Sequence, residues 1–179
     1  MPSVDAARVE RLKALIRDVP DFPKPGIVFK DITPLLKDPE GLREAGRLLA
    51  ALCSEARPDK VVAIESRGFI LGSLVAAELG RGFVPVRKPG KLPARAIRAS
   101  YALEYGTDSL EMHEDALARG ERVVIVDDVI ATGGTARAVA ELTERLGARV
   151  AGYAFLIELS FLGGRDKLGG YDVASLIRY

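Results

Sequence analysis

The sequence VVIVDDVIATGGT, at residues 123–135, decides the predicted fold of this chain. It opens with four β-branched aliphatic residues, which is typical of a strand buried on both faces of a parallel sheet. Two carboxylates, Asp127 and Asp128, come next, and a glycine-threonine loop then leads into a helical pattern. Ligands bind outside the carboxyl ends of the strands in sheets of this kind. We therefore expect a binding site directly after Val126.

The glycine-threonine loop has the chemistry of a phosphate site. Gly133 and Gly134 can take positive φ, Thr132 and Thr135 carry hydroxyls, and Ala131 adds a backbone N–H group. The helix that follows would point the partial positive charge of its N-terminus at a bound anion. Two adjacent buried carboxylates need partners, and sugar hydroxyls or a hydrated cation would supply them. The loop therefore predicts a site for a ribose phosphate, and the simpler alternative is a loop that only turns the chain.

Length and composition limit the remaining possibilities. The 179 residues suffice for one domain with its own core, so we expect a single domain over residues 1–179. The 26 Lys and Arg balance 25 Asp and Glu, which gives no overall charge toward nucleic acid or membranes. A single cysteine, Cys53, rules out an internal disulfide, and together with the single histidine, His113, it offers too few ligands for zinc. Any metal is expected to be oxygen-bound Mg²⁺, and without a signal sequence or apolar span we expect a cytoplasmic protein.

Alternating periodicities predict the order of helices and strands. Helical spacing of apolar residues and short β-branched runs alternate along most of the chain, which favours a doubly wound, mainly parallel α/β sheet with flanking helices. Residues 96–104 and 109–113 interrupt this order and predict a β-hairpin, within a flexible lid at about residues 89–113. The expected helices cover residues 5–19, 40–57, 68–79 and 135–146, and the expected strands cover residues 61–64, 83–86, 123–126 and 151–157.

Basic residues follow two of the predicted strands. Arg67 lies in ESRGF, and Lys88 and Lys91 lie in RKPGKLP. Taken alone, these side chains are typical of a solvated surface. Beside a sugar-phosphate loop they favour a second anion site, where basic groups and magnesium would neutralise a departing pyrophosphate.

Several motifs in addition to the loop carry a family resemblance. PDFPKPGIVFKDITPLLKDP (residues 20–39), ESRGF, RKPGKLP, SYALEYG and VIVDDVIATGGT occur in one order over most of the chain. In these motifs the chain resembles the type I phosphoribosyltransferases, and among them the adenine-specific enzymes. The resemblance implies the transfer of a phosphoribosyl group from 5-phosphoribosyl-1-pyrophosphate to adenine, giving AMP and pyrophosphate in purine salvage. It also implies Mg²⁺ as cofactor and a homodimer.

The resemblance assigns roles around the sugar phosphate. It implies that the loop residues Ala131, Thr132, Gly133, Gly134 and Thr135 hold the 5′-phosphate and that Asp127 and Asp128 meet the ribose hydroxyls. Arg67, Lys88 and Lys91 would bind the pyrophosphate. Glu104 would approach N7 of adenine as an acid–base group, Tyr105 would cover the reacting ribose, and Arg67 would assist catalysis. No metal ligand is assigned to the protein, because the ion would be held through the substrate.

The base is assigned to the N-terminal segment, about residues 1–38. The resemblance implies that Phe29 stacks on adenine, that backbone groups near Val28 and Lys30 read its edge, and that Leu159 forms the opposite wall. A backbone pair matched to adenine leaves buried groups unpaired with a 6-oxopurine, which explains the expected selectivity. Related enzymes often have Arg in place of Lys30, so the sequence leaves open whether this residue acts through its side chain or its backbone.

Two alternatives remain open from the sequence. The same fold could accept xanthine, hypoxanthine or guanine. A non-catalytic regulator could sense phosphoribosyl pyrophosphate and bind nucleic acid, but the segment before the predicted sheet is too short for an added DNA-binding domain. The presence of Glu104 and Tyr105 also favours an enzyme.

Overall fold

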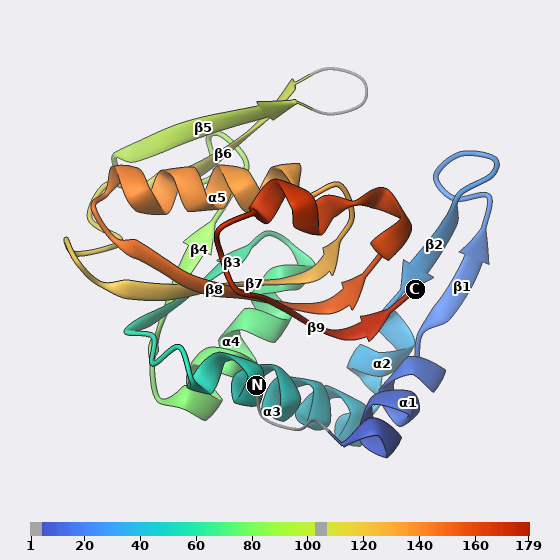
Figure 1. The fold of residues 1–179 in the computed structure, drawn as a ribbon. Helices are drawn as coiled ribbons and strands as arrows, with labels where there is room; N and C mark the ends of the chain where they lie inside the picture. Colours follow the sequence, from blue (N-terminus) through green and yellow to red (C-terminus); the bar gives the residue numbers. More distant parts are fainter. Residues whose placement is uncertain (1–4, 103–106) are drawn as a thin grey trace.

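A five-stranded parallel sheet lies at the centre of the molecule (Figure 1). The computed structural model describes residues 5–102 and 107–179. Every neighbouring pair in the sheet is parallel, which confirms the predicted α/β fold. In spatial order the strands are β4 (Gly82–Val86), β3 (Lys60–Ile64), β7 (Arg122–Ile130), β8 (Arg149–Glu158) and β9 (Val173–Arg178).

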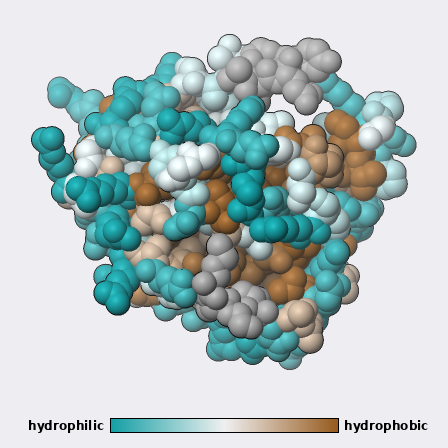
Figure 2. Space-filling view, viewed as in Figure 1, coloured by the Kyte–Doolittle hydropathy of each residue, from teal (hydrophilic) through white to brown (hydrophobic). Residues whose placement is uncertain are grey.

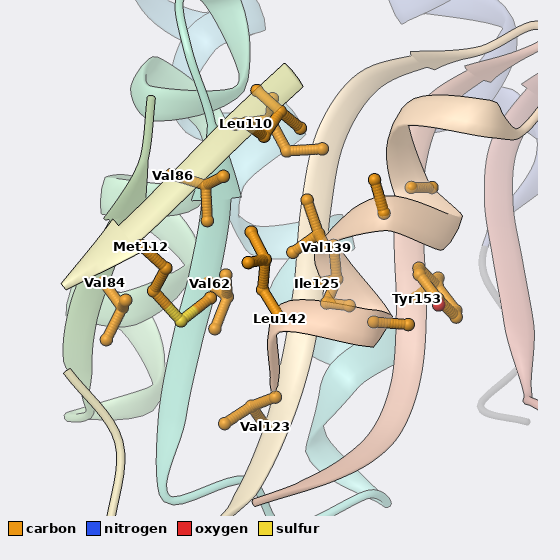
Figure 3. Packing of buried hydrophobic residues seen from close by; sticks show 14 of the residues in the cluster. Val62, Val84, Val86, Leu110, Met112, Val123, Ile125, Val139, Leu142 and Tyr153 are labelled. Carbon is orange, nitrogen blue, oxygen red and sulfur yellow. The ribbon is translucent and has the colours of Figure 1, made fainter. Parts of the chain in front are cut away.

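Helices cover both faces of this sheet (Figure 1). Buried side chains form one cluster on each face, and Figure 3 shows Val139 and Leu142 packing toward Val62 and Ile125 in one of them. The other cluster joins the second face of the sheet to its helices and includes Leu49, Leu71 and Val124. One face carries α5 (Gly134–Arg145), and the other carries α3 (Pro39–Ser54) and α4 (Arg67–Leu79), with α1 (Ala6–Ala14) and α2 (Thr33–Lys37) beside them.

The N-terminal segment differs from the prediction. The expected helix over residues 5–19 ends at Ala14, and Arg17–Pro20 forms strand β1. This strand pairs antiparallel with β2 (Val28–Asp31) outside the main sheet. Proline has no backbone N–H and cannot continue a helix, whereas it is tolerated at the end of an edge strand. The two strands form a separate unit that we call the β1–β2 ribbon.

Strand β7 also differs from the prediction, because it continues past Val126 to Ile130. Asp127 therefore lies inside the strand, opposite Phe155 of β8. On its other side β7 pairs with β3 only as far as Val126, which lies opposite Ala63. The acid pair thus extends beyond the end of β3, at the carboxyl edge of the sheet.

The predicted hairpin is formed by β5 (Ala96–Ala102) and β6 (Thr107–His113), which pair antiparallel. Ala99, Leu110 and Met112 belong to the buried cluster shared with α5, and Figure 3 shows Met112 close to Val84. Two short 3₁₀ helices, η1 (Ser160–Leu162) and η2 (Gly164–Leu168), connect β8 to β9. Within residues 5–102 and 107–179, no helix has the length and apolar character needed to cross a bilayer.

Candidate active site

A cavity of about 450 Å³ opens at the carboxyl edge of the sheet. Its walls come from the β1–β2 ribbon, the end of β3, the start of α4, the hairpin and the loop after β7. Most of the polar residues that line it were predicted from the sequence. The predicted site residues that line this cavity are Val28, Phe29, Lys30, Arg67, Lys88, Asp127, Asp128, Ala131, Thr135 and Leu159.

The acid pair lies directly against the start of α4. A Cβ atom placed on Gly68 would lie 2.5 Å from Oδ1 of Asp127, so only glycine allows this approach. The Asp128 side chain is buried and accepts a hydrogen bond from Nε of Arg67. The Asp128 backbone N–H donates to Oδ1 of Asp127 at 2.9 Å. The loop before α4 and the end of β7 therefore form one polar unit.

The two carboxylates have different electrostatic environments. Burial raises the pKa of Asp127 well above its ordinary value, and the neighbouring Asp128 charge raises it further. Asp128 is paired with the Arg67 guanidinium, whereas Asp127 accepts a hydrogen bond from the Asp128 backbone N–H. Asp127 is thus a carboxylate held without a cationic hydrogen-bond partner in the described residues, at the position where sugar hydroxyls or a hydrated cation would relieve its charge.

The glycine-threonine loop curls around a small recess beside the main cavity. Thr132 and Gly133 line this recess, of about 90 Å³, together with Asp127. Gly133 has φ of 76° and immediately precedes α5, so its conformation favours glycine. Gly134 instead borders a groove of about 300 Å³ between α5 and the hairpin. The arrangement brings backbone N–H groups and two threonines to the N-terminus of α5, as a phosphate cradle requires.

The β1–β2 ribbon forms the apolar end of the cavity. The ring of Phe29 has the guanidinium carbon of Arg67 at 5.5 Å from its centroid, and Phe22 packs edge-on at 5.3 Å. Val28 is 48% exposed, and hydrophobic atoms gather around the outer end of the ribbon in Figure 2. Together with Leu159, these side chains offer walls for a flat aromatic ligand.

The Lys30 ammonium is engaged by protein groups. Its Nζ lies 2.7 Å from Oδ1 of Asp18 and 3.9 Å from the ring centroid of Tyr179. The Lys30 side chain is largely buried by these contacts. The Lys30 ammonium is therefore held by Asp18 and Tyr179, although the residue lines the cavity.

The two predicted pyrophosphate lysines have different surroundings. Lys88 lines the cavity, and its Nζ donates to Asp108 and lies 3.3 Å from the hydroxyl of Tyr101. Burial acts to lower the pKa of Lys88, but the hydrogen bond to Asp108 and that to Tyr101 outweigh it and raise the pKa. Lys91 is linked to the site by an ion pair with Glu65, in which Nζ of Lys91 lies 2.8 Å from Oε1 of Glu65.

Glu65 is a charged residue of the site that sequence reasoning did not select. Its carboxylate is 8% exposed and also accepts from Nε of Arg87 at 2.9 Å. Burial acts to raise the pKa of Glu65, but the hydrogen bonds from Lys91 and Arg87 outweigh it and hold the pKa below its ordinary value. The position after β3, within ESRGF, was the available signal. Other lining residues not selected from sequence are Ile27, Ile64, Ser66, Tyr101, Leu110 and Val129.

The proposed acid–base residue Glu104 and its neighbour Tyr105 lie outside the described residues. Their assignments therefore remain predictions from the sequence.

Comparisons with known proteins agree on one family. The sequence profile of the phosphoribosyl transferase domain matches residues 31–171. An adenine phosphoribosyltransferase of Thermotoga neapolitana is 58% identical over 168 residues, which cover 94% of this chain and 99% of the relative. That of Carboxydothermus hydrogenoformans is 60% identical over 168 residues, with the same coverage of both chains.

Solved structures give the same result. The adenine phosphoribosyltransferase of Thermoanaerobacter pseudethanolicus superposes with a TM-score of 0.93 at 55% identity, over 96% of this chain and 99% of that one. The Saccharomyces cerevisiae enzyme, solved with adenine and an imino-altritol bisphosphate, has a TM-score of 0.89 at 44% identity, with the same coverage. The chain therefore belongs to the phosphoribosyl transferase domain family and, within it, to the adenine phosphoribosyltransferases.

Proposed function

We propose that this chain transfers the phosphoribosyl group of 5-phosphoribosyl-1-pyrophosphate to a ring nitrogen of adenine, releasing AMP and pyrophosphate in purine salvage. One observation carries the proposal: a single cavity is lined by the acid pair, by Ala131 and Thr135 of the phosphate loop, and by Phe29 and Leu159, with the rest of the loop in recesses beside it. A ribose phosphate and a flat base placed there would meet at the sugar carbon that reacts. The relatives named adenine phosphoribosyltransferase support the same reaction.

The reaction breaks the bond between C1′ and the pyrophosphate oxygen, and the electron pair leaves with pyrophosphate. The new bond forms between C1′ and the adenine nitrogen, which loses its proton. We assign binding of the 5′-phosphate to residues 131–135 and of the ribose hydroxyls to Asp127 and Asp128. Both ends of the sugar would then be held, which fixes C1′ between leaving group and base.

Charge neutralisation at the leaving group is assigned to Arg67, Lys88 and Lys91. Lys88 and Lys91 are paired with Asp108 and Glu65, so pyrophosphate binding would exchange or share these partners. Glu65 holds Arg87 and Lys91 on the same side of the site, which supports a common anion site. Glu104 is proposed to handle the proton of adenine and Tyr105 to cover the ribose; loss of such an acid–base group typically lowers turnover by about 100- to 10,000-fold.

Magnesium is the proposed cofactor. The described residues contain no group of three or more His, Cys, Asp or Glu that could hold a metal ion. The acid pair, with one member already bound to Arg67, fits an ion that keeps its waters and binds mainly to substrate phosphates and hydroxyls. Bound in this way, Mg²⁺ would neutralise the departing pyrophosphate.

Base selection is assigned to backbone groups near Val28 and Lys30, with Phe29 stacked on the ring. The contacts of the Lys30 ammonium with Asp18 and Tyr179 support a backbone role for this residue. Adenine offers an N6 donor and an N1 acceptor, and a 6-oxopurine offers the reverse. A buried backbone pair matched to adenine would therefore reject hypoxanthine and guanine.

Purified protein with radiolabelled adenine, phosphoribosyl pyrophosphate and Mg²⁺ tests the proposal. We expect AMP and pyrophosphate in equal amounts, and removal of Mg²⁺ should suppress the reaction. Unlabelled adenine should compete far better than hypoxanthine, guanine or xanthine. Absence of AMP under these conditions would contradict the proposal, and preference for a 6-oxopurine would change the base.

We also propose a homodimer and a cytoplasmic location, with residues 89–113 as a lid over the site. Two large apolar side chains, Phe161 and Ile70, are 74% and 41% exposed and would be covered if they lay at such an interface. A highly charged sugar phosphate does not cross membranes unaided, which supports a location where this substrate is made. Light scattering of the purified chain tests the dimer.

A further inference from the structure

The chain after β8 makes an unusually close backbone contact with the phosphate loop. A Cβ atom placed on Gly164 would lie 2.1 Å from the carbonyl oxygen of Ala131 and 2.9 Å from the backbone nitrogen of Gly133. In the other direction, a Cβ atom on Gly133 would lie 2.3 Å from the carbonyl oxygen of Gly164. Real side chains do not approach neighbouring atoms this closely, so neither glycine position has room for a Cβ atom.

The η2 segment that presents Gly164 is anchored on its far side. Leu168 is 1% exposed in the cluster under α5. The Arg165 guanidinium donates from Nε to Oε1 of Glu158 at 3.0 Å and from Nη1 to the Val173 carbonyl at 2.6 Å. Glu158 is itself buried at the end of β8. The position of Gly164 is therefore fixed by β8, β9 and the core, independently of any ligand.

We propose that Gly164 is a positioning residue for the 5′-phosphate, because its backbone fixes the shape of the loop at residues 131–135. The inference rests on the proposed function of that loop. Gly164 touches the loop from outside the recess that Thr132 and Gly133 line, and it is not among the lining residues of that recess. Its effect is thus transmitted through the loop backbone to the N–H groups that meet the phosphate.

The chain offers a matched control for this contact. Gly164 does not have positive φ, so alanine would meet no backbone strain there and the steric overlap can be tested alone. Gly169, just after η2, also lacks positive φ, and a Cβ atom on it would lie 3.4 Å from its nearest neighbour, the Asp166 carbonyl. Gly164→Ala and Gly169→Ala therefore add the same methyl group to one segment, with and without overlap on the phosphate loop.

Binding of two small anions provides the readout. Ribose 5-phosphate tests the loop, whereas inorganic pyrophosphate tests the opposite anion site. We expect Gly164→Ala to weaken ribose 5-phosphate binding, measured by calorimetry, by at least about tenfold. Pyrophosphate binding by Gly164→Ala, and both affinities of Gly169→Ala, should stay within about twofold of those of the unmodified protein.

The outcomes separate this inference from the proposed function. If the unmodified protein binds no ribose 5-phosphate, the proposed function of the loop fails. If it binds and Gly164→Ala binds equally well, or loses both anions equally, the positioning role is wrong. Should Gly164→Ala fail to fold, Arg165→Met decides instead: releasing the anchor should weaken ribose 5-phosphate binding selectively, and unchanged binding would overturn the inference.

Discussion

At the sugar-phosphate end of the cavity, the structure relies on backbone fitted to backbone, whereas the base end relies on side chains of a two-stranded ribbon. Gly68, Gly133 and Gly164 each leave no space for a Cβ atom. The β1–β2 ribbon lies outside the main sheet, and its tip exposes Phe22 and Val28. The family profile begins at Asp31. It therefore covers the residues of the sugar-phosphate end but not the residues of β2 that precede Asp31.

This difference separates what the fold fixes from what it can vary. Close backbone contacts tolerate almost no added volume, so the grip on the sugar phosphate should be common to enzymes of this fold. Side chains on an edge ribbon can be exchanged without moving the sheet. The base should therefore be the part of the substrate that such a scaffold can change, and four measurements test this contrast.

The largest difference should appear when one methyl group is added at the sugar-phosphate end and, in a second variant, at the base end. Gly133 and Gly26 both have positive φ, 76° and 85°, so alanine costs roughly 1–2 kcal/mol of strain at either position. Only Gly133 also meets a neighbour, the Gly164 carbonyl, while a Cβ atom on Gly26 has nothing within 4 Å. We expect Gly133→Ala to lower kcat/KM for phosphoribosyl pyrophosphate by about 100-fold or more. Gly26→Ala should stay within about threefold; equal losses would erase the contrast.

Asp127→Asn should weaken function and stabilise the free protein. A hydrogen bond to a charged group contributes about 1.5–3 kcal/mol, so kcat/KM for phosphoribosyl pyrophosphate should fall about 10- to 100-fold. The pKa of Asp127 is raised in the fold, so its ionised form lowers stability at neutral pH, and the penalty disappears as pH falls and the group is protonated. At neutral pH the variant should thus melt at a higher temperature than the unmodified protein, by roughly 2–4 °C per kcal/mol of removed penalty. In acid the two proteins should melt at the same temperature.

Asp128→Asn is the control for that experiment. It leaves the Arg67 guanidinium without its carboxylate, so the free protein should lose stability at neutral pH. If both variants change the melting temperature in the same direction, the different environments assigned to the two carboxylates are wrong.

A smaller effect is expected at the base end. Lys30→Met removes the ammonium held by Asp18 and Tyr179, and Tyr179→Leu removes the ring under it. Cation–π contacts contribute about 0.5–2 kcal/mol, so both variants should raise KM for adenine about two- to thirtyfold and leave KM for phosphoribosyl pyrophosphate unchanged. Tyr179→Phe keeps a ring and should behave as the unmodified enzyme. A large loss in Lys30→Met with none in Tyr179→Leu would indicate that the ammonium reads the base directly.

The smallest effect concerns the anchor behind the phosphate loop. The hydrogen bond from Arg165 lowers the pKa of Glu158, so this group stabilises the fold above its unfolded pKa, and the contribution is lost as pH falls through the folded pKa. Glu158→Gln should therefore melt a few °C lower at neutral pH, and the difference should narrow in acid. Thermal melts from neutral to acidic pH measure it, and a difference that does not depend on pH would contradict the assigned charge pair.

Local sequence was sufficient for the sugar-phosphate end. The run Val123 to Val126, the acid pair and the loop are contiguous, and their order alone places them at one sheet edge. The end of β7 was set too early, because Val129 and Ile130 gain partners in β8 that no local pattern reveals. Likewise, the helices closed by Gly80 and Gly147 were found from their periodicity and their terminal glycines.

The base end depended on contacts between distant residues. Strand β1 is four residues long and ends in proline, so its pairing with β2 left no period to detect. Asp18 and Tyr179 reach Lys30 from opposite ends of the chain, and β9 was not predicted at all. Gly164 lies far along the chain from Ala131, and a glycine without positive φ carries no local sign of a close contact.

Arg67 contacts both ends of the cavity, through its hydrogen bond to Asp128 and its position over the Phe29 ring. If a ligand in one subsite changes the position of this shared guanidinium, it also changes the affinity of the other subsite for its ligand. Linkage is reciprocal: the factor by which bound sugar phosphate changes the affinity for the base equals the factor by which bound base changes the affinity for the sugar phosphate. The two substrates would then bind cooperatively through a single guanidinium, without any rearrangement of the sheet that carries it.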